Sequence, residues 1–306
     1  MLNFDYVSLT VLSAVVREGS FESAAKALGF TQSAVSQRIK SLEEKAGSLL
    51  IVRGRPCVPT EVGLQLCNHL EQVSLLQHEL NDRLSELIDG NEDTAATVRI
   101  SVNNDSLATW FPAVIKRAVR ELNVIFDLVP DDQEHTEGNL KSGEALAVVT
   151  ANDQPIQGCR RISLGAMAYI AVASKEFYDT NFSEGVSPAL LKGTSCLAFD
   201  RKDTIQDQWM NLCFGESVEV IAHMVPSYDG YVACCVNGIG WGLVPEAAAK
   251  RHLKTGELVE LSPGKSVKVS LHWQSGTQSS EILRRLGDVV LEEAMKALLP
   301  DEYREA

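Results

Sequence analysis

Residues 32–40, QSAVSQRIK, carry a mixture of side chains that is suited to binding nucleic acid. Amides and hydroxyls of the kind that contact base edges alternate with cations of the kind that hold phosphates. On a helix they lie opposite the apolar Val35 and Ile39, and they are Gln32, Ser33, Ser36, Gln37, Arg38 and Lys40. A surface helical hairpin with a solvated polar face has the same pattern, so this stretch alone leaves both interpretations open.

The residues before this stretch predict a second, shorter helix and a tight turn that would position it. Apolar residues recur at helical spacing at Phe21, Ala24, Ala25 and Leu28. Gly29 follows them, and glycine ends a helix without steric cost. The pair therefore predicts a helix-turn-helix, whose second helix would enter the major groove of DNA.

The residues that follow predict a β-wing. After Gly47, residues 49–52 read as a short strand, residues 53–56 as a turn and residues 58–60 as the returning strand. Arg53 and Arg55 in that turn would lie along the phosphate backbone and add affinity without sequence information. Two arginines in an ordinary exposed turn are the alternative. With a first helix at residues 4–17, the pattern predicts a winged helix-turn-helix domain over residues 1–60.

Residues 61–89 predict one long helix, with Thr60 as its N-cap. About 28 residues at 1.5 Å each give a rod of roughly 40 Å. A stripe recurs at three- and four-residue spacing at Leu66, Leu70, Val73, Leu76 or Gln77, Leu80, Leu84 and Leu87. An apolar stripe on a protruding rod needs a partner, so a dimerisation helix is expected. Packing of the stripe on its own domain is the alternative.

The remainder of the chain predicts a hinge followed by an α/β domain. Residues 90–97 are small and polar, as in a flexible connection. From residue 98 to residue 306, strand and helix patterns alternate, which predicts parallel sheets with helices on both faces. The length suits two lobes: lobe I at about 98–168 and 270–306, and lobe II at about 169–269. A ligand cleft is expected between them, at the carboxyl ends of strands.

Charge divides along the chain in a way that fits this organisation. The 306 residues carry a net charge of −13, but residues 1–60 hold seven Lys and Arg against five Asp and Glu. A slightly basic head on an acidic body suits a DNA-binding module joined to a domain that stays off DNA. Seven scattered cysteines without a C-x-x-C pair, and an N-terminus unlike a signal peptide, predict a cytoplasmic protein.

The sequence gives no sign of an enzyme. The six histidines form no H-E-x-x-H pair, and neither G-x-S-x-G nor a phosphate-binding G-x-x-x-x-G-K-[ST] occurs. Glycines 238, 240 and 242 do not match the dinucleotide motif and precede their strand. No catalytic residue, metal site or cofactor is therefore expected. A solute-binding protein would share the two lobes, but it would need export and has no use for a wing.

This layout resembles the LysR-type transcriptional regulators. Residues 24–43, AAKALGFTQSAVSQRIKSLE, are similar to the DNA-binding signature of that family. Within it, the chain looks most like the lysine- and arginine-responsive ArgP and LysG subfamily. The similar segments are residues 101–112, 205–209, 225–231, 237–246 and 255–264. The resemblance implies a periplasmic-binding-protein-like effector domain, a homodimer or homotetramer, a DNA operator, contact with RNA polymerase, and control of a basic amino-acid exporter.

A basic amino acid as effector would need carboxylates for its two cations and donors for its carboxylate. Three places where predicted strands end offer such groups, and the expected effector-binding residues are Asn103, Asp105, Ser106, Asp132, Ser227 and Asp229. Asp105 can equally be a plain helix cap. The chain departs from the subfamily at Asn104, Asp229 and Tyr231, where Ala, Glu and Phe are usual. A different small molecule remains the alternative effector.

Overall fold

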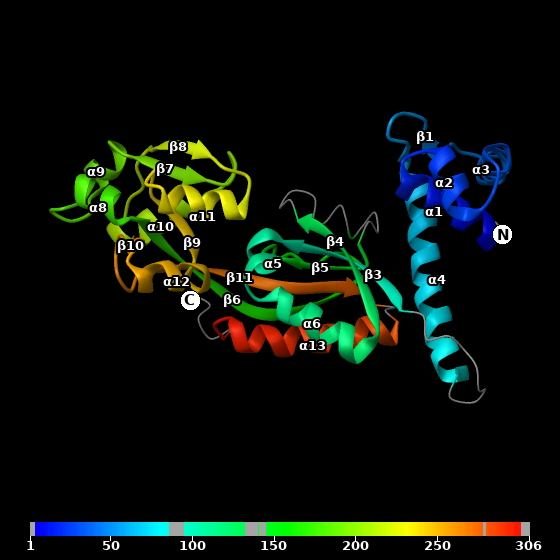
Figure 1. Cartoon of the computed structure of the whole chain (residues 1–306). Helices are drawn as coiled ribbons and strands as arrows, with labels where there is room; N and C mark the ends of the chain where they lie inside the picture. The colour runs from blue at the N-terminus through cyan, green and yellow to red at the C-terminus, as the bar shows by residue number, and fades with distance from the viewer. Residues whose placement is uncertain (1–3, 86–94, 132–139, 141–144, 278–279, 301–306) are drawn as a thin grey trace.

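The computed structural model describes residues 4–85, 95–131, 140, 145–277 and 280–300 of the chain. A helical head with a wing leads into one long helix, which reaches a two-lobed α/β domain (Figure 1). The expected fold class is confirmed. Residues 86–89 of the expected long helix, residues 90–94 of the expected hinge and Asp132 lie outside the described residues.

The head is built from three helices whose ends are set by their own sequence. They are α1 (Tyr6–Glu18), α2 (Phe21–Leu28) and α3 (Gln32–Ala46). Gly29 has the positive φ of 67° that ends α2, and the Thr31 hydroxyl accepts the Ala34 N–H to begin α3. Ala25, Val35 and Ile39 are at most 4% exposed, so the apolar faces predicted for α2 and α3 form the core of the head.

The wing consists of β1 (Ile51–Val52) and β2 (Val58–Pro59), which pair antiparallel. Helix α4 (Glu61–Ser85) follows directly, and the Thr60 hydroxyl accepts the Gly63 N–H at 3.1 Å as its N-cap. The same hydroxyl donates to the Leu49 carbonyl oxygen at 2.8 Å. The wing and the start of α4 are therefore one hydrogen-bonded unit.

The apolar stripe of α4 has two different environments. Leu66 and Leu70 pack against the core of the head. Leu76, Leu80 and Leu84 are 54%, 55% and 37% exposed, as expected of a surface that a second chain would cover. Leu75, which the predicted stripe did not include, is only 2% exposed because it enters the core of the effector domain.

The effector domain is organised around a seven-stranded mixed sheet in the order β10-β6-β11-β5-β3-β4, with β9 also paired to β6. The strands are β3 (Ala96–Asn103), β4 (Val124–Asp131), β5 (Ala147–Thr150), β6 (Cys159–Ser174), β9 (Gly242–Pro245), β10 (Leu258–Glu260) and β11 (Ser266–Gly276). Within this sheet β3, β4 and β5 pair in parallel and the other pairs are antiparallel, so the expectation of parallel sheets holds for only part of it. Strand β3 begins at Ala96, inside the range expected for the hinge.

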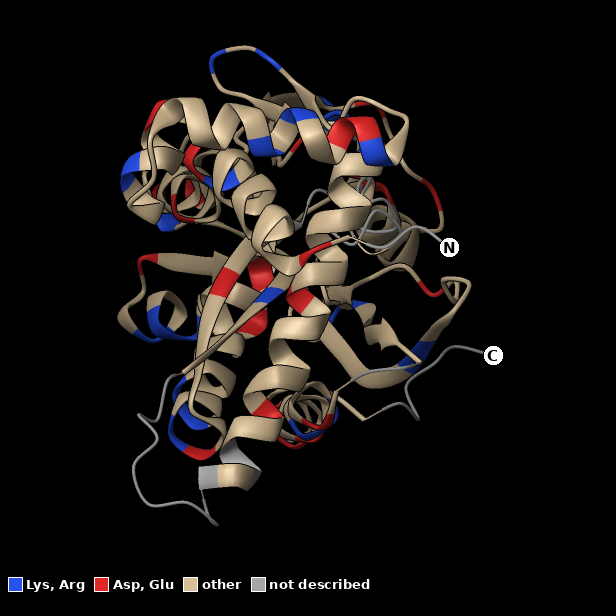
Figure 2. Cartoon of the chain, turned by 90° about the vertical axis from the view of Figure 1, so that its right-hand side faces the viewer, with Lys and Arg blue, Asp and Glu red and all other residues tan. Residues whose placement is uncertain are grey.

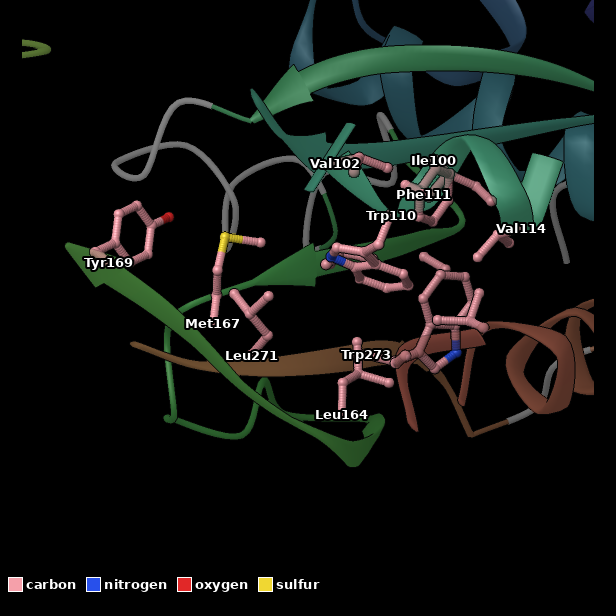
Figure 3. Close-up of a cluster of buried hydrophobic side chains, with 14 of the residues drawn as sticks. Ile100, Val102, Trp110, Phe111, Val114, Leu164, Met167, Tyr169, Leu271 and Trp273 are labelled. Atoms are coloured by element: carbon pink, nitrogen blue, oxygen red, sulfur yellow. The ribbon is translucent and has the colours of Figure 1, made fainter. Parts of the chain in front are cut away.

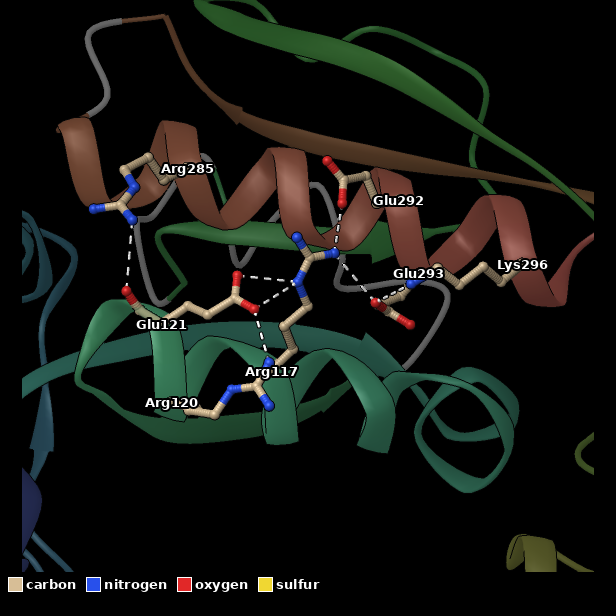
Figure 4. A network of polar contacts seen from close by, with 7 residues as sticks. All are labelled: Arg117, Arg120, Glu121, Arg285, Glu292, Glu293 and Lys296. Carbon is tan, nitrogen blue, oxygen red and sulfur yellow. Dashed lines mark hydrogen bonds and ion pairs between the residues drawn. The ribbon is translucent and has the colours of Figure 1, made fainter.

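Lobe I is completed by α5 (Asn104–Thr109), α6 (Phe111–Leu122) and α13 (Glu281–Ala297). Trp110, Phe111, Val114 and Trp273 are buried between these helices and the sheet (Figure 3). Arg117 connects α6 to α13 on the surface, where its guanidinium is 2.5 Å from Glu292 and 3.3 Å from Glu293 (Figure 4). Helices distant in sequence are thus joined on one side of the sheet.

Lobe II contains the segments between the two long strands β6 and β11. It holds α8 (Lys175–Asn181), α9 (Pro188–Lys192), α10 (Ile205–Phe214), α11 (Tyr228–Val236), α12 (Glu246–Thr255) and a two-stranded parallel sheet of β7 (Ser195–Ala198) and β8 (Ile221–Met224). Trp209 and Trp241 are fully buried, with ring centroids 5.5 Å apart. Strands β6 and β11 pair along most of their length and carry the chain between the lobes.

The contact of α4 with the effector domain includes a carboxyl group with a perturbed pKa. Burial raises the pKa of Glu71 to about 7, while the nearby Arg99 acts in the opposite direction. Asp127 of β4 raises it further, and Cys67 lies one helical turn away on α4. At neutral pH this carboxyl group is therefore close to its own titration point.

We expect Glu71→Gln to stabilise the protein relative to wild type at pH 8 and not at pH 5. The folded pKa lies above the ordinary value, so stability present below about pH 4.5 is lost as the pH rises through about 7. Partial exposure limits the effect to about 1–2 kcal/mol. Urea unfolding of both proteins at the two pH values measures it. If the unfolding free energies of the two proteins differ by the same amount at pH 5 and at pH 8, the pKa of Glu71 is ordinary.

Candidate functional site

The head exposes the polar face predicted for α3. Gln32, Ser33, Gln37, Arg38 and Lys40 are exposed and Ser36 is half-buried, whereas Val35 and Ile39 face the core. Arg53 and Arg55 are exposed in the turn of the wing. Figure 2 shows basic residues in this turn, which forms the top of the head in that view. The surface has the helix, wing and cations that groove and phosphate binding require.

Two of these arginines are held in place by aromatic rings. The Arg38 guanidinium lies 5.5 Å from the centroid of Phe30, and that of Arg53 lies 5.1 Å from Phe21. A cation over a ring face at this distance is attracted to it and loses part of its freedom. Arg53 is thereby fixed relative to α2, which orients the wing before any DNA is bound.

A cleft of about 720 Å³ lies between the two lobes. Lobe I lines it with Asn103, Asn104 and Asp105, where β3 ends and α5 begins. Lobe II lines it with the loop after β7 and with the start of α11, and the long strands contribute Tyr169, Lys268 and Val269. Its volume is in the range of small-molecule sites.

Asp105 is the central carboxylate of this cleft. Tyr169 donates a hydrogen bond from its hydroxyl to Asp105 Oδ2 at 2.5 Å. Burial raises the pKa of Asp105, the bond from Tyr169 lowers it, and the charge of Asp203 raises it again. A carboxylate that loses solvation in this way gains most when a cation binds beside it.

A tight loop after β7 supplies two further carboxylates. Asp203 Oδ2 accepts the Phe199 N–H at 2.9 Å and Asp200 Oδ1 accepts the Lys202 N–H at 2.7 Å. Gln206 also donates to Asp203 Oδ2, at 3.1 Å, so the loop is fixed by its own hydrogen bonds. Both aspartates line the cleft opposite Asp105 and are charged groups held in place before a ligand binds.

The cleft also contains groups of the opposite character. Lys202 and Lys268 line it and are exposed, so they can meet a carboxylate. Tyr228 lines it as well, and burial, together with the charge of Asp105, raises its pKa to about 12. Its hydroxyl therefore stays a donor at neutral pH. Three carboxylates, two cations and three phenols, including that of Tyr231, suit a ligand with charges of both signs.

The structure brings together only some of the residues predicted for this site. Asn103 and Asp105 line the cleft; Ser106 is fully buried behind them. Asn103 Oδ1 and Ser106 Oγ are buried and have no hydrogen-bond partner among the described residues. Of the two, Asn103 lines the cleft and can accept a donor from a ligand. Asp132 lies outside the described residues.

Ser227 and Asp229 do not line the cleft. The Ser227 hydroxyl caps α11 by accepting the Gly230 N–H at 3.3 Å. Asp229 lines a separate depression of about 390 Å³ with Asn237 and His252, on the side of α11 that faces α12. The strand-to-helix junction was located correctly, but one step along a helix turns a side chain by about 100°, and this turns Asp229 away.

Sequence reasoning missed the lobe II and strand residues of the cleft. They include Tyr169, Asp200, Lys202, Asp203, Tyr228 and Lys268. Strand β7 was not predicted, so the aspartates that follow it were not recognised as strand-end residues. The available signal was the short apolar run at residues 196–199, followed by DRKD.

Two matches to known protein families identify the family of this chain. Residues 7–64 match the family described as bacterial regulatory helix-turn-helix proteins, lysR family, and residues 91–295 match the LysR substrate binding domain. The chain belongs to the LysR family. It is a DNA-binding transcriptional regulator that responds to a small molecule, and it is not an enzyme. No helix among the described residues is long and apolar enough to cross a membrane.

Similar proteins define the type within the family. The regulator ArgP of Pseudomonas aeruginosa is 40% identical over 98% of this chain and 99% of its own length. LysG of Mycobacterium tuberculosis is 38% identical over 94% of this chain and 92% of its own. The crystal structure of ArgP from Mycobacterium tuberculosis has a TM-score of 0.78 at 36% identity and covers 97% of this chain and 100% of that one. This LysR regulator is therefore of the ArgP and LysG type.

A solved structure of full-length LysG from Corynebacterium glutamicum is described as containing the bound effector Arg. Its TM-score is 0.69 at 32% identity, and the match covers 97% of this chain and 100% of that one. The similarity of both chains extends over the head, the linker helix and the effector domain. The subfamily predicted from the sequence is confirmed.

Proposed function

We propose that this regulator binds arginine or lysine in the cleft between its lobes. The carboxylates of Asp105 and Asp203 on opposite walls are the observation that carries this proposal. The two cations of the ligand bind these carboxylates, while Lys268 and Lys202 approach its own carboxylate. The arginine bound to the related LysG supports the same class of ligand. Ser227 and Asp229 are not included in this proposed site.

Calorimetry of the full-length protein with arginine, lysine, citrulline and glutamate tests the proposal. Citrulline has nearly the shape of arginine without the guanidinium charge, so it isolates the contribution of the carboxylates. We expect saturable binding of arginine or lysine and at least about 100-fold weaker binding of citrulline. Equal binding of arginine and citrulline, or binding of glutamate alone, would contradict the assignment and favour a different small molecule.

For DNA, we propose that Gln32, Ser33, Ser36 and Gln37 contact bases and that the cations hold phosphates. The cations are Arg38, Lys40, Arg53 and Arg55. Two recognition helices, paired through the linker helices, would occupy successive major grooves of a partly palindromic operator. The exposed polar face of α3 supports the first assignment, and the two arginine–aromatic contacts support the second.

We expect Arg53→Ala to weaken binding to all DNA sequences by the same factor, about 5- to 10-fold at low salt. A phosphate contact carries no sequence information, and its loss lowers the slope of log K against log salt by about 1. Fluorescence anisotropy with a selected operator and with a random duplex measures both. Arg284→Ala, which removes the same charge from α13 of the effector domain, is the control. A changed sequence preference would show that the wing contacts bases.

Assembly and regulation follow from the same proposal. Leu76, Leu80 and Leu84 of α4 would pair two chains, and the exposed Val119, Ile125 and Ile221 of the effector domain offer apolar surface for a homotetramer. The bound complex would contact RNA polymerase in the cytoplasm and control a basic amino-acid exporter.

Sedimentation of the Leu80→Glu variant tests the pairing of two chains through α4, and monomers are the expected result.

A further inference from the structure

One face of the linker helix α4 is attached to the effector domain of its own chain. Glu71, Leu75 and Glu79 are spaced four residues apart and so lie along a single face. Leu75 is 2% exposed and belongs to the same core as Val98 and Leu286. Glu71, Leu75 and Glu79, together with the effector-domain groups that they meet, form the linker contact.

Glu79 caps a helix of the effector domain. Its Oε1 accepts the N–H of Ile282 at 2.9 Å, in the first turn of α13. The Ser280 hydroxyl accepts the next free N–H, from Leu283. The first N–H groups of a helix have no partner within it, and its N-terminus favours a negative charge. The Glu79 carboxylate of the linker helix therefore supplies a hydrogen-bond acceptor and a negative charge at the start of α13 in lobe I.

Glu71 lies near the guanidinium of Arg99, which itself lacks one of its hydrogen-bond partners. Arg99 of β3 acts electrostatically on Glu71, and Arg99 Nε lies 3.5 Å from Asp127 Oδ2 of β4. Glu71 Oε2 and Arg99 Nε are both buried without a hydrogen-bond partner among the described residues. Two carboxylates share one guanidinium at this place.

Strand β3 connects this place to the cleft. Arg99 and Asn103 lie on the same face of the strand, since side chains alternate along it, and about 13 Å separates them. Asn103 lines the cleft and Asp105 follows it in α5. Parallel pairing with β4 and β5 on its two sides makes β3 a rigid connection.

We propose that the linker contact transmits effector binding to the DNA-binding head, with Glu71 and Glu79 holding α4 against lobe I in one of two arrangements. A ligand at the Asn103 end of β3 favours one arrangement because its affinity differs between them. The position of α4 sets the position of the head, which begins at the other end of the same helix. This inference rests on the proposed function only for the identity of the effector.

The first test needs no effector. Hydrogen exchange of full-length Glu79→Ala should show about tenfold faster exchange at the start of α13, because the Ile282 N–H loses its acceptor. The control is Ser74→Ala, an exposed residue of the same helix that lies on neither the linker contact nor the exposed leucine face. Operator affinity without effector should change at least about threefold in Glu79→Ala and in Glu71→Gln, but not in the control. Unchanged exchange or unchanged operator affinity overturns the proposal.

The second test measures coupling. The operator Kd is measured without and with the effector that calorimetry identifies, and the ratio of the two values gives the coupling. In the double variant Glu71→Gln, Glu79→Ala this ratio should move toward 1. Sedimentation of the same variant should give the wild-type assembly state, because neither side chain lies on the exposed leucine face. A full wild-type ratio in this variant overturns the proposal. Failure of arginine and lysine to bind wild type would overturn only the effector assignment, since the first test is independent of it.

Discussion

Asp105→Asn should abolish measurable binding of a basic amino acid at ordinary ligand concentrations. The carboxylate lies at the junction of β3 and α5, it accepts a 2.5 Å hydrogen bond from Tyr169, and burial raises its pKa. Removing one partner of a desolvated charge pair costs about 2–5 kcal/mol, which is roughly 30-fold to several-thousand-fold in Kd. Asparagine has the size of aspartate, and its side-chain oxygen can still accept the hydrogen bond from Tyr169. The loss of affinity therefore measures the contribution of the charge.

The control and the pH dependence make this prediction specific. Asp229→Asn removes the same charge from a helix next to the cleft and should change effector affinity less than about threefold, because surface charges contribute little. In wild type, affinity should fall as the pH falls through the raised pKa of Asp105, since only the ionised form attracts the ligand cation. That loss should be absent in Asp105→Asn. Equal effects of the two variants would place the cation site elsewhere.

Gly63→Ala should unfold or displace the wing and abolish DNA binding. A Cβ at position 63 would lie 2.0 Å from the Leu50 carbonyl oxygen, which is backbone and cannot rotate away. That oxygen also accepts the Thr60 N–H at 2.9 Å, so relief of the clash separates β1 from the start of α4. Alanine normally favours a helix by about 1 kcal/mol over glycine, but overpacking costs about 1–3 kcal/mol or more.

Thermal unfolding and operator binding of Gly63→Ala check this result. The unfolding temperature of the head should fall and operator affinity should decrease at least about 30-fold, since the wing arginines lose their position. Val62→Ala is the matched control, because Val62 is the neighbouring residue in the same turn and is 42% exposed. A Gly63→Ala protein that binds DNA normally would contradict the close packing of α4 on the wing.

The head could be predicted almost completely because its signals are local. Gly29 ends α2, Thr31 begins α3 and Gly47 ends it, and each acts through hydrogen bonds within a few residues. The amphipathic periodicity of α2 and α3 gave the correct buried residues. Their polar face was therefore identified in full from the sequence, although its contacts with DNA remain a prediction.

The effector domain was less predictable because its cleft depends on distant residues. Tyr169 and Asp105 are 64 residues apart and meet only because β6 crosses the sheet in one register. The sequence pattern predicts only residues 169–173 of β6 as a strand, because the first half of β6 contains Arg160, Arg161 and Gly165, which do not read as a buried strand. Short elements such as β7 and α9 have too few residues for periodicity to be recognised.

The two long strands have a consequence for how ligand specificity can change. Ile170 of β6 pairs with Ser266 of β11, so the chain leaves lobe I and returns to it at directly opposed residues about 5 Å apart. Everything between them is topologically an insertion into one β-hairpin. A replacement module whose ends are equally close could occupy the same place without changing the strands that contact α4. Half of the cleft is thus exchangeable as one contiguous segment with two junctions, while the half attached to the DNA-binding apparatus is retained.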